Sequence, residues 1–327
     1  MIRLTIRQME YFEALAEAQH FGRAADMAGV TQPALSAQIA EMEQRLGCRL
    51  FERGGRVVRL TEDAQMLRPR IVRILTELRD LEAAAQRGRR ALEGRFRLGI
   101  IPTIAPYLLP RMLPRVRERF PALQLELMEA VTERLVEETV GGRLDGFIAA
   151  LPIEHPLICS ETLFTDRFFL AVPEGDPGFV EPPVPPESPA LERLMLLAEG
   201  HCMRDQALAV CGKVRPSAMS NYGATSLTTL LQMVAHGHGL TLVPEMAVGD
   251  GISAAISIVP FAEPMPSRTI GLACRKNSSR QEECLLLAEL LREFGNPSDE
   301  AGKREREPEP HQRQQNDTGP EAIVSVL

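Results

Sequence analysis

Three features that often classify a protein are absent from this sequence. No apolar run approaches the ~20 residues of a membrane-spanning helix, so no membrane partner is expected. The opening stretch, residues 1–7, lacks the apolar core of a signal peptide. A disulfide framework is not expected either, because the six cysteines of a cytoplasmic chain are reduced at rest. We therefore expect a cytoplasmic protein in which any disulfide is regulatory.

The composition is that of a globular protein with one basic end. The chain has 327 residues, 44% hydrophobic and 25% charged, which is enough for two or three ordinary domains. Its net charge is −7, but residues 1–90 hold 15 Arg against 12 acidic side chains. This end is positive by three charges, and the remainder carries −10. A basic end favours nucleic-acid binding, although three surplus charges are weak evidence alone.

The pattern over residues 1–62 predicts a winged helix-turn-helix. A first helix has one apolar face, a second spans 23–28 before Gly29, and a third is capped by Thr31. The third helix buries an apolar stripe of Leu35, Ile39, Met42 and Leu46, with Pro33 in its first turn. Its entry end presents Gln32, Pro33 and Ser36 off that stripe, where a recognition helix meets DNA base edges. A three-helix bundle used for protein contact is the alternative.

A basic hairpin and a long helix follow. Residues 50–61 predict a two-stranded wing that turns at 54–55 and carries Arg53, Arg56 and Arg59 for phosphate or minor-groove contact. Over 63–92 a linker helix repeats apolar residues at alternating spacings of four and three, as in a dimeric coiled coil. Pro69 predicts a bend or break near Arg68. The seam consists of Leu67, Ile71, Ile74, Leu78, Leu81 and Ala85.

The rest of the chain predicts a two-lobed α/β domain. Strands at 95–101, 123–128 and 147–150 alternate with helices at 107–120 and 133–141, which predicts a mixed, largely parallel sheet. Thr103 and Thr132 each follow a strand, at the edge where such sheets bind ligands. We expect lobe I at 93–167 and 268–295, and lobe II at 168–267, together a regulatory domain of 93–295. Residues 173–189 predict a loop, and 296–327 predict a disordered tail.

The segment 200–211 contains two cysteines that suit a thiol switch. A helix from Cys202 to Cys211 would separate their backbones by roughly 13 Å. A disulfide needs Cα atoms within about 7 Å, so joining them would refold the segment. Cys202 would also start that helix beside His201 and Arg204, a setting that stabilises a thiolate.

Two other interpretations of these cysteines stay open on the residues alone. Both could be inert, since intracellular cysteines are commonly small buried hydrophobes. Zinc binding with His236 and His238 is disfavoured, because a gap of nine residues matches no usual ligand pair, and we predict no metal or other cofactor. The remaining cysteines and histidines are expected to be structural or without a functional role: Cys48, Cys159, Cys274, Cys284, His20, His155 and His311.

Residues 7–65 resemble the DNA-binding segment of the LysR-type transcriptional regulators. The resemblance implies base and phosphate contacts through Gln32, Pro33, Ser36 and the wing residue Arg53, and it departs from the family at Ala64, where glycine is usual. The matching residues are 21–25, 30–36, 38–39, 43, 46–47, 50–53 and 60–62.

Residues 95–295 resemble the hydrogen-peroxide-sensing group of that family, in which the regulatory domain is two-lobed and similar to periplasmic binding proteins. Ordinary members lack both cysteines, so the resemblance favours the switch. The matching stretches are 99–110, 200–211, 224–230, 239–244 and 266–272.

That resemblance assigns roles to the site. Cys202 would be the peroxidatic cysteine and Cys211 the resolving one, linked through a sulfenic acid. Arg268 or Arg204 would offset the thiolate charge. The residues implied in holding peroxide are Thr103, Thr132, His201 and Asp205.

The predicted protein is a regulator of antioxidant genes and not an enzyme. Its implied partners are double-stranded promoter DNA, hydrogen peroxide, RNA polymerase, a thiol reductant and further copies of itself in a homodimer or homotetramer. Two alternatives are a LysR-type regulator that binds an organic acid between the lobes, and a thiol peroxidase.

Overall fold

The computed structural model describes residues 4–52, 57–86, 91–175, 182–185, 188–212, 214, 216, 224–249 and 252–295. Their buried apolar side chains form three clusters. We call these the N-terminal core, around Phe12 and Phe51, the first α/β core, around Phe96 and Phe147, and the second α/β core, around Phe168. Among the described residues, no helix is long and apolar enough to cross a membrane.

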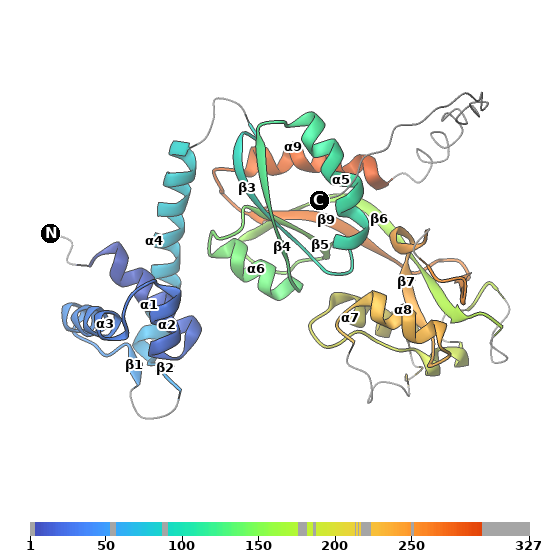
Figure 1. Ribbon diagram of the computed structural model, residues 1–327, viewed down its shortest axis with the longest axis horizontal. Helices are drawn as coiled ribbons and strands as arrows, with labels where there is room; N and C mark the ends of the chain where they lie inside the picture. Colours follow the sequence, from blue (N-terminus) through green and yellow to red (C-terminus); the bar gives the residue numbers. More distant parts are fainter. Residues whose placement is uncertain are drawn as a thin grey trace, which may run out of the picture. The chain divides into compact units, whose positions relative to one another are not determined.

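Three helices and a small hairpin surround the N-terminal core (Figure 1). The helices are α1 (Ile6–Ala18), α2 (Phe21–Met27) and α3 (Gln32–Leu46), and β1 (Phe51–Glu52) pairs antiparallel with β2 (Arg59–Leu60). Thr31 occupies the N-cap position of α3 as expected, but its side chain makes no capping hydrogen bond. His20, to which we gave no functional role, caps α2 by accepting from the amides of Gly22 and Arg23.

Helix α4 (Glu62–Gln86) runs without interruption through Pro69, so a break near Arg68 is wrong, and the alternative of a bend stays a prediction. Arg68 bonds Glu13 of α1 at 2.7 Å, and Ile71 is buried in the N-terminal core, so the helix is held on both sides of the proline. Pro69 itself is exposed, which leaves the carbonyl that loses its donor open to water. Ala64 is fully buried in the same core.

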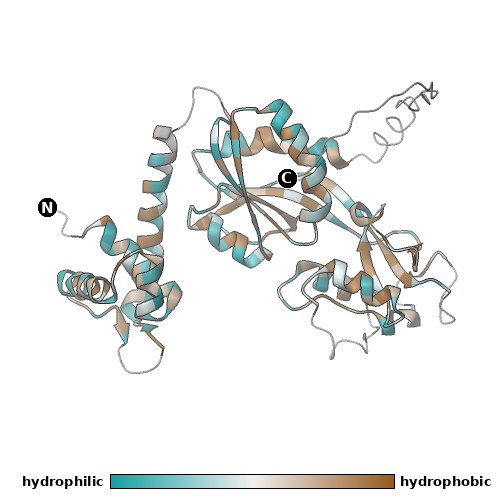
Figure 2. Cartoon of the chain, viewed as in Figure 1, coloured by the Kyte–Doolittle hydropathy of each residue, from teal (hydrophilic) through white to brown (hydrophobic). Residues whose placement is uncertain are grey.

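The predicted seam of α4 divides into two parts. Ile71 packs into the N-terminal core together with Leu75, which lies outside the seam. The side chain of Ile71 is therefore buried within one chain and does not face a partner helix. Ile74 and Leu81 remain 43% and 66% exposed. Figure 2 shows the resulting bands of hydrophobic and hydrophilic residues along the helix. Among the described side chains of α4, an exposed apolar strip therefore lies on the second half, and Met66 is exposed separately on the first half.

The first α/β core contains a mixed sheet. β3 (Gly94–Ile100) pairs in parallel with β4 (Leu123–Glu129) and β5 (Gly146–Leu151), whereas β9 (Ser267–Arg275) is antiparallel to β5. α5 (Ala105–Arg119) and α9 (Gln281–Arg292) lie on one side of the sheet and α6 (Thr132–Val140) on the other (Figure 1). A mixed sheet is confirmed, but a largely parallel one is wrong, because parallel pairing is confined to β3, β4 and β5.

A single long strand connects the two α/β cores. β6 (Ile158–Pro173) pairs along its first part with β9, and along its second part with β7 (Thr241–Pro244) and β8 (Ile256–Pro260), always antiparallel. The sequence predicted only its second part. The second α/β core also contains α7 (Cys202–Cys211), α8 (Leu227–Ala235) and short 3-10 turns at Pro189–Arg193 and Glu245–Ala247.

Candidate functional site

The two cysteines of the predicted switch lie at opposite ends of α7. Gly200 has φ +90, a conformation that favours glycine, and it leads the chain into the helix. Cys202 is partly buried and packs against the first α/β core. Cys211 has no exposed surface and belongs to the second α/β core. Both thiols are free, so the helix separates them as expected.

A buried arginine is the charged centre of the site. The Arg268 side chain is fully buried, and its Nε donates to Asp166 Oδ2 at 2.9 Å. Nη1 donates to Thr103 Oγ1 at 2.9 Å, and Nη2 donates to the Thr103 carbonyl at 3.1 Å. Asp166 also accepts from the amide of Met246, which lies in the 3-10 turn Glu245–Ala247. These hydrogen bonds hold the Arg268 guanidinium in a fixed position without a bound ligand.

The hydroxyl of Thr132 is buried and, apart from the sulfur of Cys202, has no hydrogen-bond partner among the described residues. Thr132 is the first residue of α6 after β4, and Thr103 follows the parallel neighbour β3, so both lie at the carboxyl edge of the sheet. A hydrogen bond to the sulfur leaves the lone pairs of this buried oxygen free for a ligand. Its donor and acceptor capacity suits a small polar ligand beside Cys202.

The pKa of the Cys202 thiol is raised, chiefly by burial. Arg268 opposes that rise through its charge, and hydrogen bonds from the Thr132 hydroxyl and the Met203 amide to the sulfur lower the pKa further; Asp205 raises it. The expected stabilisation of the thiolate is therefore wrong in its net direction, since the pKa is raised, and wrong in naming His201 and Arg204, although the helix start does contribute. The stabilising cation comes from β9, and the start of α7 contributes one amide.

The neighbours of Cys202 in sequence play smaller parts. Burial lowers the pKa of His201, so this side chain favours its neutral form. Arg204 donates to the carbonyl of Leu197 at 3.0 Å, which commits it to the second α/β core. Asp205 is exposed. Of the two candidate arginines, Arg268 is the one whose charge lowers the pKa of Cys202.

Sequence reasoning missed two residues that build this site. Asp166 lies directly opposite Arg268 in the β6–β9 register and neutralises it. Tyr107 of α5 packs against the second α/β core. Its pKa is raised by burial, and a hydrogen bond with Thr228 of α8 offsets part of that rise. An acidic residue just before the apolar run 168–172 was the available signal for Asp166, but that part of β6 was not predicted.

The candidate DNA-contact residues are placed only in part. Gln32 and Pro33 are exposed at the start of α3, and Ser36 is half-buried one turn later. Arg59 is exposed on β2. Arg53 and Arg56 lie outside the described residues. Over the described parts of the chain, no group of three His, Cys, Asp or Glu side chains could hold a metal ion.

Two family models cover nearly all of the chain outside its C-terminal tail. Residues 6–65 match the bacterial regulatory helix-turn-helix protein, lysR family, and residues 89–296 match the LysR substrate binding domain. The DNA-binding transcriptional dual regulator OxyR of Escherichia coli K12 is 38% identical over 290 residues, which are 88% of this chain and 95% of that protein.

Solved structures agree with the family models. Full-length OxyR from Pseudomonas aeruginosa, a cysteine variant, has a TM-score of 0.68 at 32% identity and covers 89% of this chain and 98% of its own. A variant of Corynebacterium glutamicum OxyR with bound H2O2 has a TM-score of 0.59 at 31% identity and covers 93% and 99%. These relatives are transcription regulators and not enzymes, which removes the thiol peroxidase alternative. The chain belongs to the LysR family of transcriptional regulators, and within that family to the OxyR group.

Proposed function

We propose that this protein is a peroxide-responsive transcription regulator in which Cys202 is oxidised first and Cys211 resolves it. The observation that carries the proposal is the placement of Cys202 beside the Thr132 hydroxyl and the buried Arg268, in contact with the first α/β core while α7 belongs to the second. A change at this sulfur acts on the contact between the two cores.

The residues around Cys202 suit a reaction with hydrogen peroxide. The Cys202 thiolate attacks one peroxide oxygen, the O–O bond breaks, and the leaving hydroxide takes up a proton to become water. Thr103 and Thr132 orient the peroxide through their hydroxyls, and Arg268 stabilises the thiolate. His201, neutral through burial, accepts or returns a proton, and Asp205 and Arg204 shape the mouth of the site.

The second step links the sulfurs. Cys211 Sγ attacks the Cys202 sulfenic sulfur, the S–O bond breaks and a second water leaves, so one peroxide oxidises two thiols. Because α7 holds the cysteines at its two ends, the bond requires the helix to unwind. A thiol reductant would restore the helix.

The test is the promoter response of three variants to micromolar peroxide. Cys202→Ser should abolish both the disulfide and the change in transcription. Cys211→Ser should still reach sulfenic acid at Cys202, trapped with dimedone, but should not switch transcription. Cys48→Ser is the matched control and should behave as the unmodified protein. A Cys202→Ser protein that still responds would instead favour a regulator that binds an organic ligand.

DNA contact is proposed through Gln32, Pro33 and Ser36 in the major groove and Arg53 and Arg56 on the wing. The exposed entry end of α3 supports this assignment. Affinity for a promoter duplex should fall steeply with salt, and Arg53→Ala should reduce the slope by about one phosphate contact, ~0.9 in log–log units. Gln44→Ala, at an exposed position near the other end of α3, should leave the slope unchanged. An unaltered slope in Arg53→Ala would remove the wing from the interface.

The remaining partners follow from the same proposal. The exposed apolar strip of α4 supports a homodimer, from which a homotetramer could be built. We also propose RNA polymerase as a partner, a cytoplasmic location, and the domain division 1–62, 63–92 and 93–295. Sedimentation of the full chain with Leu81→Glu tests the strip, because a charge there should weaken association. Unchanged sedimentation would place the interface elsewhere.

A further inference from the structure

Three cysteines from three different elements meet in the first α/β core. Cys159 lies on β6, Cys274 on β9 and Cys284 on α9. The Sγ atoms of Cys159 and Cys274 are 3.5 Å apart, and the thiol of Cys284 is hydrogen-bonded with that of Cys274. We had assigned all three to separate structural roles because their sequence neighbours carry no chemistry. Their neighbours in space are one another.

The geometry of Cys159 and Cys274 matches that of a disulfide precursor. The two residues are directly opposed in the antiparallel β6–β9 register. Opposed residues in such a ladder have Cα atoms about 4.5 or 5.5 Å apart, and both values fall within the range for disulfides. The sulfurs need to approach by about 1.5 Å to reach a bond length of ~2.05 Å. Rotation of the side chains supplies that movement, so no backbone refolding is needed.

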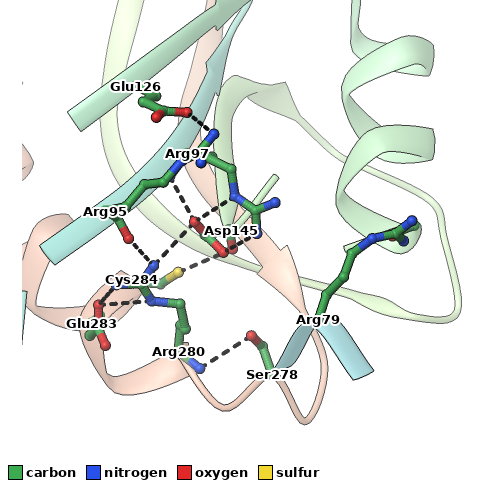
Figure 3. Close-up of polar contacts among 10 residues, drawn as sticks. Arg79, Arg95, Arg97, Glu126, Asp145, Ser278, Arg280, Glu283 and Cys284 are labelled. Carbon is green, nitrogen blue, oxygen red and sulfur yellow. Dashed lines mark hydrogen bonds and ion pairs between the residues drawn. The ribbon is translucent and has the colours of Figure 1, made fainter. Parts of the chain in front are cut away.

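The cluster has a fixed inner side and an open outer side. Cys284 Sγ donates to the carbonyl of Asp145 at 3.6 Å, and Asp145 is itself held by Arg97 and Arg280 (Figure 3). A small cavity of about 10 Å³ lies against all three thiols. Its lining also includes three exposed residues, Glu161, Gln281 and Leu285, so the cluster lies close to solvent.

The thiols of Cys159 and Cys274 differ in acidity. The pKa of Cys274 is lowered to about 7, because its thiolate accepts hydrogen bonds from the thiol of Cys284, in place of that thiol's bond to the Asp145 carbonyl, and from the thiol of Cys159. The pKa of Cys159 is raised to about 11 by burial and by the neighbouring Cys274. One sulfur is thus ready to act as a nucleophile near neutral pH while the other keeps its proton.

We propose that Cys159 and Cys274 form a second oxidisable thiol pair, separate from Cys202 and Cys211, which a hydroperoxide converts to a cross-strand disulfide without a change of fold. The Cys274 thiolate attacks a peroxide oxygen, the O–O bond breaks, and the hydroxide released is protonated to water or, from an organic hydroperoxide, the alkoxide to alcohol. Cys159 Sγ then attacks the sulfenic sulfur, loses its proton, and displaces a second water. Two thiols are oxidised and one hydroperoxide is reduced.

The bond would join the two strands that also hold Asp166 and Arg268. Cys159 and Asp166 are both on β6, and Cys274 and Arg268 are both on β9. Oxidation here would tie these strands together at one end and leave α7 untouched. The Cys159–Cys274 pair would therefore become oxidised without changing the conformation of α7.

The test uses the full chain carrying Cys202→Ser and Cys211→Ser, so that its result does not depend on the proposed function. After treatment with hydrogen peroxide, free thiols are alkylated and the protein is mapped without reductant. The expected product is a peptide linking Cys159 to Cys274, lighter by two hydrogens than the reduced pair. Adding Cys159→Ala should remove that product, whereas adding Cys48→Ala, the matched control, should keep it.

Two results would overturn the proposal. One is a protein in which Cys159 and Cys274 both remain fully alkylatable after peroxide and denaturation. The other is a link between Cys274 and Cys284 in place of Cys159. Because the parent chain contains all three cluster cysteines, either result is informative even if Cys159→Ala fails to fold.

Discussion

Cys202 and Cys211 share one helix, yet they belong to different hydrophobic cores, whereas Cys159 and Cys274 are 115 residues apart and their sulfurs are already in contact. The first pair cannot be joined without unwinding α7, and the second can be joined by side-chain rotation. Closeness in sequence therefore says little about what oxidation does to a protein. The conformational consequence of a disulfide depends on how far the fold holds the two thiols apart.

Hydrogen exchange should give the largest contrast between the two pairs. Oxidation of Cys202 and Cys211 should remove the protection of α7 amides, on the order of a hundredfold or more, because the helix must open. Oxidation of Cys159 and Cys274 in the Cys202→Ser, Cys211→Ser background should leave α7 and the β6–β9 amides protected. Mass spectrometry of peptides from both samples measures this. If either disulfide caused the same loss of amide protection in α7, the proposed contrast between the two cysteine pairs would be wrong.

Breaking the buried ion pair between Asp166 and Arg268 should cost much of the protein's stability. Asp166→Ala leaves the fully buried Arg268 without its carboxylate, and we expect a loss of about 3–5 kcal/mol in the free energy of unfolding. Glu161→Ala removes a partner of Arg292 in an exposed pair on the same strand, and should cost about 0–1 kcal/mol. Urea unfolding of the two variants measures both. Similar midpoints would mean that Arg268 finds another partner.

The pH dependence of oxidation should separate the two sites. The raised pKa of Cys202 means that its thiolate fraction, and its rate with peroxide, should rise about tenfold per pH unit from pH 6 to 8. Cys274, with its pKa lowered to about 7, should level off above about pH 8. Rates of sulfenic acid or disulfide formation, mapped by peptide, test this. A rate at Cys202 that is flat above pH 7 would contradict its raised pKa.

A smaller effect is expected from Thr132→Val. The hydroxyl lowers the pKa of Cys202 by hydrogen bonding, and its loss should slow oxidation of Cys202 at pH 7 roughly fivefold, the effect of about 1 kcal/mol. Oxidation of Cys274 should be unchanged, which makes it an internal control within one sample. Stopped-flow mixing with peroxide provides the rates. A slowing at both cysteines would indicate general damage to the fold.

Local patterns predicted much of this molecule because they depend on neighbouring residues. The helix that follows Cys202 and the strands before Thr103 and Thr132 were predicted from apolar spacing and alternation, and the start of α3 was predicted from Thr31 and Pro33. Pro69 failed as a sign of a helix break, because α4 is held on both sides of the proline, by the contact of Arg68 with Glu13 and by Ile71 in the N-terminal core.

The contacts that the sequence did not predict depend on pairing between strands that are distant in the sequence. The first part of β6 includes the polar run 160–162, which does not alternate as a half-buried strand does, and without that strand neither Asp166 nor Cys159 had a partner. The approach of Cys284 to Cys274 also needs the position of α9 over the sheet. No spacing within the sequence carries that information.

The β-bulge in β6 limits how the length of this segment can change during evolution. From Cys159 to Asp166 the strand advances seven positions, while its partner advances six from Cys274 to Arg268, and the extra residue falls between Thr162 and Phe164. Inserting one more residue there would reverse the faces of all side chains on one side of the insertion, unless the bulge widened to take it up. Either the ion pair or the thiol pair would then be lost, even if every named residue were retained. Deleting the extra residue would instead leave six positions on both strands and keep both pairs opposed. Among relatives, insertions should therefore be excluded from 159–166 more strictly than the loss of this single residue.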